Sequence, residues 1–147
     1  MSAESRLHVR IHKGYLLSSI ALLALLVLIA LFVRDSFVRP FLGDVLAVLW
    51  VHLCIRAVLN VRHTIAACVA LGIAFTLECA QYFALLDVLG LRGFPPARII
   101  LGATFDPLDL LAYALGFILI LAIERGIVRR QARTTARRGA PKEAAEK

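Results

Sequence analysis

The sequence predicts an all-α membrane protein with four transmembrane helices, and two observations support this fold class. Apolar residues make up 61% of the 147-residue chain, and the mean hydropathy is +0.83. A soluble domain contains about 45–50% apolar residues. Each crossing of a hydrocarbon core takes about 20 helical residues, so the chain has room for four spans but not for six. The apolar excess also excludes a disordered chain, because disorder requires low hydrophobicity.

Four apolar segments are long enough to cross a bilayer. They are Gly14–Val33, about Asp44–Asn60, Thr64–Leu86, and a segment from Asp106 to about Val128. The first segment also has the basic flank of a secretory signal. Its apolar run is longer than the usual stretch of about 7–15 residues, and no small-residue cleavage site follows it. We therefore predict a retained first helix.

Two of these helices have recognisable start signals. Asp106 can cap the fourth helix, Pro107 suits its first position, and Asp109 stabilises the positive end of the helix dipole. Asp44 is a weaker cap for the second helix. Capping alone is an alternative to any binding role for these three aspartates.

The segment between the third and fourth spans contains a cluster of helix breakers, Gly93-Phe94-Pro95-Pro96. Residues 97–105 are too few to cross a membrane, so we predict a surface-lying or re-entrant segment here. The chain then divides into an N-terminal cytoplasmic segment (1–13), a four-helix transmembrane domain (14–128) and a basic cytoplasmic tail (129–147), which we expect to be disordered.

Basic residues predict that both termini lie in the cytoplasm, because loops rich in lysine and arginine stay on that side. The predicted inner segments contain Arg6, Arg10, Lys13, Arg62 and eight basic residues from Arg125 to Lys147. The predicted outer segments contain only Arg34, Arg39, Arg92 and Arg98. Topology and anionic lipid explain the basic tail, which lacks the interleaved aromatic residues of a nucleic-acid-binding segment. We expect no nucleic-acid partner.

In this orientation the outer half of the protein contains six of the ten acidic residues and four of the seventeen basic residues. Short loops on so small a bundle must lie close together, so these charges can pair around an outward-facing polar pocket. The charged residues concerned are Arg34, Asp35, Arg39, Asp44, Glu78, Asp87, Arg92, Arg98, Asp106 and Asp109.

Glu78 lies inside the third predicted span, about 12 Å from its outer end. An unpaired charge at such a depth costs about 2–3 kcal/mol or more, so we expect Glu78 to be paired inside the bundle. Its partner is an arginine, or Gln81 or Tyr113 if the acid is neutral. Asp109, Tyr113 and Gly116 share one face of the fourth helix, where Gly116 lets another helix approach closely.

Several other polar residues have ordinary structural explanations. Asp35 is expected to be a solvated loop charge, and His52 a hydrogen-bonded packing residue rather than a proton relay or ligand. Arg56 can extend its side chain to the lipid headgroups. The cysteines lie in apolar segments, and no Cys/His spacing suggests zinc, so we expect no metal and no cofactor. They are Cys54, Cys68 and Cys79.

Arg39 stands directly before Pro40, and proline favours an extended conformation in the residue that precedes it. We therefore expect stiff, extended backbone to present Arg39 at the rim of the pocket. There it can clamp Asp44 or offer two donors to an incoming phosphate.

Several short stretches are similar to known families. Residues 35–44 (DSFVRPFLGD), 78–83 (ECAQYF), 89–91 (LGL) and 109–113 (DLLAY) resemble domain-of-unknown-function family 2809 of small bacterial membrane proteins, over roughly residues 15–125. More distantly, Glu78-x-x-Gln81 with Asp106-x-x-Asp109 and Gly116 is similar to VanZ-like membrane proteins, which are linked to glycopeptide resistance. These resemblances imply a four-helix membrane architecture and imply no reaction.

We therefore predict a multi-pass protein of the bacterial inner membrane with a binding or accessory role at the cell envelope. Its expected partners are membrane lipids, in particular an anionic lipid headgroup or a lipid-linked glycan, because arginine suits phosphate. The candidate binding residues are Arg34, Arg39, Asp44, Glu78, Gln81, Arg98, Asp106, Asp109 and Tyr113. Self-association is left open.

Three alternatives to binding stay open. The first is a metal-assisted membrane hydrolase in which Glu78, Asp106 and Asp109 hold a divalent ion. The others are a transport subunit with Glu78 as its carrier site, and a purely structural subunit. We favour binding over catalysis, and assign no catalytic residue, because the sequence contains no recognisable nucleophile–base pair.

Overall fold

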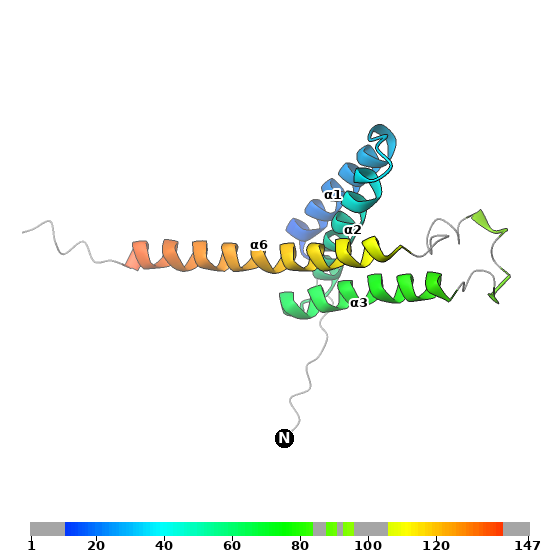
Figure 1. The fold of residues 1–147 in the computed structure, drawn as a ribbon. Coiled ribbons are helices and arrows are strands. Elements are labelled where there is room, and N and C mark those ends of the chain that lie inside the picture. Colours follow the sequence, from blue (N-terminus) through cyan, green and yellow to red (C-terminus); the bar gives the residue numbers. More distant parts are fainter. Residues whose placement is uncertain (1–10, 84–87, 91–92, 96–105, 140–147) are drawn as a thin grey trace, which may run out of the picture.

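The protein is a four-helix bundle in the computed structural model, which describes residues 11–83, 88–90, 93–95 and 106–139 (Figure 1). The helices are α1 (Lys13–Phe32), α2 (Val38–Val58), α3 (His63–Tyr82) and α6 (Pro107–Gly139). All four are long and apolar enough to cross a membrane, and the described residues contain no β-strand. This confirms the predicted all-helical fold with four candidate spans.

Helix α2 is the central element of the bundle. It packs against α1, α3 and α6, and α3 also packs against α6, whereas α1 packs mainly against α2 and meets α3 at the edge contact between the rings of Tyr15 and His63. In Figure 1, α3 and α6 lie side by side and the α1–α2 hairpin crosses them obliquely. Ser19 is the one buried residue of α1, so nearly all of this helix lies at the surface of the bundle.

Small residues allow α2 and α6 to pack closely. Ala112 is fully buried, and a Cβ added at Gly116 would lie 2.8 Å from the carbonyl oxygen of Val45 and 3.2 Å from the Cβ of Val48. These distances are shorter than van der Waals contact, so only glycine fits at this crossing. The expectation that Gly116 permits close approach of a helix is confirmed.

The start of α2 differs from the prediction. The helix begins at Val38, so Asp44 lies inside it and cannot be its cap. Instead, Asp35 accepts hydrogen bonds from the backbone N–H groups of Val38 (2.7 Å) and Phe37 (2.9 Å), which also hold the pKa of Asp35 below its usual value. Asp35 is therefore the side chain that satisfies the start of α2, and not merely a solvated loop charge.

The predicted extended conformation of Arg39 is also wrong, because Arg39 is the second residue of α2. Pro40 follows it in the first turn. Proline is tolerated there, since the N–H groups of the first turn have no partner within the helix. The local preference for extended backbone is thus overridden by continuation of the helix.

The start of α6 agrees with the prediction and its end does not. The side chain of Asp106 accepts a hydrogen bond of 2.9 Å from the N–H of Leu108, which confirms Asp106 as the cap. The helix continues to Gly139, whereas we expected disorder from residue 129 onward. Alanine, arginine and glutamine in this extension are strong helix formers. The predicted surface-lying or re-entrant segment, residues 97–105, lies outside the described residues.

Candidate functional site

Glu78 is the most deeply buried ionisable side chain described, with no exposed surface. One carboxylate oxygen accepts a hydrogen bond of 2.9 Å from the backbone N–H of Asp106, and the other accepts one of 3.4 Å from the hydroxyl of Tyr113. The expected pairing of Glu78 inside the bundle is confirmed, with Tyr113 as a partner. No described arginine forms an ion pair with it.

Asp44 and Asp109 lie next to this pair, and together with Glu78 and Tyr113 they form what we call the acidic cluster. The carboxyl groups of Asp44 and Asp109 lie close enough to interact across the α2–α6 contact. The cluster comes from three helices and lies at the end of the bundle where α2 and α6 begin.

A cavity of about 870 Å³ adjoins the acidic cluster. Side chains of α1 and α3 line it, and α2 lines it between them. Its apolar wall includes Leu26 and Ile29 from α1 and Ile73 and Leu77 from α3. The cavity therefore combines a polar end with apolar sides.

Six of the nine predicted binding residues line this cavity: Arg34, Arg39, Asp44, Gln81, Asp109 and Tyr113. Asp35 and Ser36 from the α1–α2 loop line it as well. Glu78 touches the cavity-lining Tyr113 without lining the cavity itself, and Asp106 is exposed at the start of α6. Arg98 lies outside the described residues.

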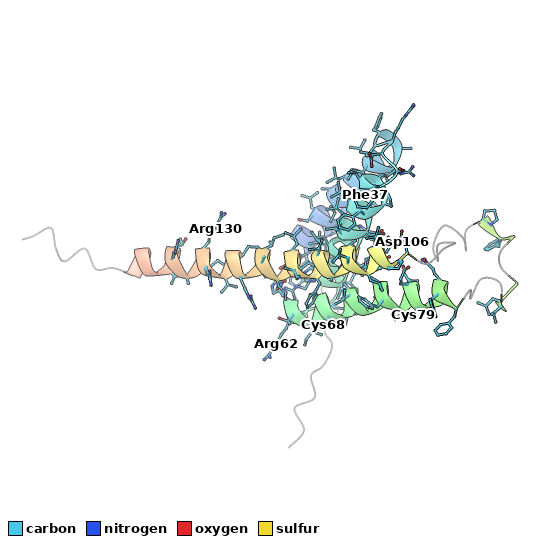
Figure 2. The ribbon with its side chains drawn as sticks, in the orientation of Figure 1. Phe37, Arg62, Cys68, Cys79, Asp106 and Arg130 are labelled. Atoms are coloured by element: carbon cyan, nitrogen blue, oxygen red, sulfur yellow. The ribbon has the colours of Figure 1, made fainter. Side chains whose placement is uncertain are left out.

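A second polar cluster, which was not predicted from the sequence, lies at the opposite end of the bundle. Figure 2 places Asp106 and Cys79 at one end of the α3–α6 pair and Arg62 at the other. Near Arg62, one oxygen of Glu124 lies 3.3 Å from Nε2 of His52 and 2.5 Å from Nδ1 of His63. We call His52, His63 and Glu124 the histidine cluster.

Arg56 connects the histidine cluster to α1. Its guanidinium donates to the carbonyl oxygen of Val61 and the hydroxyl of Tyr15, and lies 3.2 Å from Nε2 of His63. Only 8% of Arg56 is exposed, so the expectation that it extends to the lipid headgroups is wrong. His52 and Arg56 are four residues apart and share a face of α2, and this spacing is the one feature of the sequence that could have indicated the cluster. The partners from α3 and α6 become neighbours only in the folded bundle.

The comparisons with known proteins identify a family and no function. Residues 33–117 match a family described as "Protein of unknown function (DUF2809)". No curated protein and no solved structure matches the chain. The matched region contains every described residue of the acidic cluster, and it excludes α1 and Glu124. Since the match covers more than half of the chain, the protein belongs to the DUF2809 family.

Proposed function

We propose that this chain is a multi-pass protein of the bacterial inner membrane that binds an anionic lipid headgroup or a lipid-linked glycan on its outer face. The observation that supports this function best is the cavity of about 870 Å³, in which Arg34 and Arg39 occupy the same space as Asp44 and Asp109. Cations and hydrogen-bonding carboxyl groups thus face a single ligand-sized volume, since ligand pockets occupy about 300–1,000 Å³.

The lining of the cavity suits both the polar headgroup and the hydrocarbon chain of such a ligand. Arg34 and Arg39 are exposed, and a guanidinium can bind phosphate through two parallel N–H donors. Deeper in the cavity, Gln81, Asp109 and Tyr113 provide donors and acceptors for hydroxyl groups. The apolar side chains of α1 and α3 are suited to a hydrocarbon chain, because α1 is available to lipid along nearly its whole length.

The distribution of basic residues supports an outward-facing cavity. Arg62 lies at the end of the bundle opposite the acidic cluster, and the long basic part of α6 after Val128 extends beyond that same end. Basic segments remain in the cytoplasm, so this end is proposed to face inward and the cavity outward.

A metal-assisted hydrolase built on Glu78, Asp106 and Asp109 is less well supported. Both oxygens of Glu78 already accept hydrogen bonds, from Asp106 and from Tyr113. The side chain of Asp106 is engaged at the start of α6. Glu78, Asp106 and Asp109 are not among the described residues whose ligand atoms lie close enough together to hold a metal ion.

The test is retention of lipid by the full chain purified in mild detergent and analysed by native mass spectrometry. We expect a specific phosphate-bearing lipid to co-purify with the wild type, to be depleted in Arg39→Lys and to be lost in Arg39→Ala. Lysine keeps the charge but loses the two-donor geometry. Arg130→Lys is the matched control, because Arg130 is exposed on α6 and does not line the cavity. Equal retention by all four proteins would contradict the proposal.

A further inference from the structure

The histidine cluster brings three metal-ligating side chains from three helices to one point. His52 of α2, His63 of α3 and Glu124 of α6 each offer one atom, and these atoms all lie within 4.8 Å of one another. In the part of the chain that the structure describes, no other group of this kind occurs. Two imidazole nitrogens and a carboxylate oxygen are the donor set found in open zinc sites.

Each residue of this cluster has a buried polar atom without a hydrogen-bond partner. The side chain of His52 is 6% exposed and that of Glu124 is 16% exposed. Nδ1 of His63 and the facing oxygen of Glu124 are buried 2.5 Å apart, yet they form no hydrogen bond of ordinary geometry. A nitrogen and a carboxylate oxygen at this distance repel each other unless a cation or an aligned proton lies between them.

We propose that His52, His63 and Glu124 bind a divalent transition-metal ion of the zinc class. Metal–ligand bonds of about 2.0–2.2 Å in a tetrahedral arrangement place neighbouring ligand atoms about 3.3 Å apart. The separation between Nε2 of His52 and the Glu124 oxygen is 3.3 Å. Withdrawal of His63 by less than about 1 Å brings its Nδ1 to the same distance from the Glu124 oxygen.

The fourth coordination position of the proposed metal site can be reached from a cavity large enough to hold water. His63 and Glu124 both line a cavity of about 660 Å³ at this end of the bundle, between the start of α3 and the middle of α6. A water molecule or a small anion can therefore complete the coordination, as in zinc sites that keep an open position. The site is separate from the cavity at the acidic end, so it does not depend on the proposed function.

Arg56 competes with the metal for His63. Coordination through Nδ1 leaves the proton of the neutral ring on Nε2, which then no longer accepts a hydrogen bond from Arg56, 3.2 Å away. Arg56 retains the carbonyl oxygen of Val61 and the hydroxyl of Tyr15 as acceptors. Its charge also opposes a nearby cation, as do the charges of the cavity-lining arginines: Arg62, Arg125 and Arg129.

The experiment uses the full chain in detergent with a histidine-free affinity tag, stripped of metal by a chelator and titrated with Co²⁺. We expect one Co²⁺ per chain, with the strong visible absorption of a four-coordinate ion, and its displacement by Zn²⁺. His63→Ala and Glu124→Gln should lose this absorption at equimolar Co²⁺. Arg56→Gln should tighten binding. His12→Ala is the matched control, because His12 lies at the same end outside the cluster.

Glu124→Gln keeps the size of the side chain, and an unchanged gel-filtration profile shows that it folds. The proposal is overturned if the wild type gives no such absorption, or if folded Glu124→Gln binds Co²⁺ as the wild type does. It is also overturned if His12→Ala loses binding in the same way as His63→Ala. Weaker binding by folded Arg56→Gln would contradict coordination through Nδ1 of His63.

Discussion

Glu78 accepts a hydrogen bond of 2.9 Å from the backbone N–H of Asp106, which lies 28 residues further along the chain. Asp106 in turn caps α6 through its own side chain, and Tyr113, less than two turns into that helix, donates to the second oxygen of Glu78. One fully buried carboxylate thus fixes the end of α3 to the first two turns of α6. The position of these turns sets where Asp109 meets Asp44.

Glu78→Gln is expected to retain more stability than Glu78→Leu. The amide oxygen of glutamine can still accept from Asp106, and its NH₂ group can donate to the Tyr113 oxygen. Leucine leaves the Asp106 N–H and the buried Tyr113 hydroxyl without this partner, at a cost of about 1–3 kcal/mol for the buried hydroxyl. Thermal unfolding in a fixed detergent measures the difference.

Glu78→Lys is expected to be the most damaging change at this position, since it places an unpaired positive charge in a fully buried site. If Glu78→Leu unfolds at the same temperature as the wild type, the hydrogen bonds to Asp106 and Tyr113 do not hold α3 to α6.

Gly116→Ala should destabilise the α2–α6 contact by about 1–3 kcal/mol, because the new methyl group overlaps the Val45 backbone, which cannot rotate away. Gly126→Ala, in the same helix, is the control. A Cβ at Gly126 meets nothing within 4 Å, so alanine should gain up to about 1 kcal/mol from helix propensity. Equal unfolding temperatures for the two variants would show that α2 and α6 do not cross at Gly116.

The ionised carboxylate of Asp35 should stabilise the folded protein, and this stabilisation should be lost in acid. Its folded pKa lies below its unfolded value because Val38 and Phe37 donate to the carboxylate. The contribution of Asp35 to the free energy of unfolding is therefore fully present above the unfolded pKa of about 4, and it is lost as the pH falls through the folded pKa. Asp35→Asn keeps an acceptor at the cap but has no proton to gain.

The check on Asp35 is thermal unfolding at about pH 5 and at about pH 3. The wild type should lose more stability than Asp35→Asn over this interval, since all other carboxyl groups are common to the two proteins. Parallel losses in both proteins would show that Asp35 does not stabilise the start of α2.

The orientation of the bundle can be tested with reporter fusions after residues 62, 92 and 130. The excess of basic residues at the α2–α3 turn and beyond α6 predicts cytoplasmic signals at residues 62 and 130, and an external signal at residue 92. An external signal at residue 130 would show that the bundle has the opposite orientation in the membrane. The acidic cluster would then face the cytoplasm and the histidine cluster the outside.

Much of the fold follows from the sequence by itself. The four candidate spans follow from apolar length, because a bilayer requires about 20 residues per crossing whatever their neighbours are. The cap at Asp106 and the close approach at Gly116 follow from local chemistry and side-chain size. The burial of Glu78 required that it be paired, so a partner could be predicted, and Tyr113 was among those named.

The start of α2 and the polar clusters were decided by the tertiary structure. Local signals favoured Asp44 as a cap and an extended Arg39, but Asp35 supplies an earlier cap and frees Asp44 to meet Asp109 on another helix. His52, His63 and Glu124 each have an ordinary local explanation, and only the crossing of α2, α3 and α6 places them together. Apolar length along one helix sets which segments are able to cross a membrane. It does not set the relative height and rotation of separate helices, and those determine which polar side chains meet.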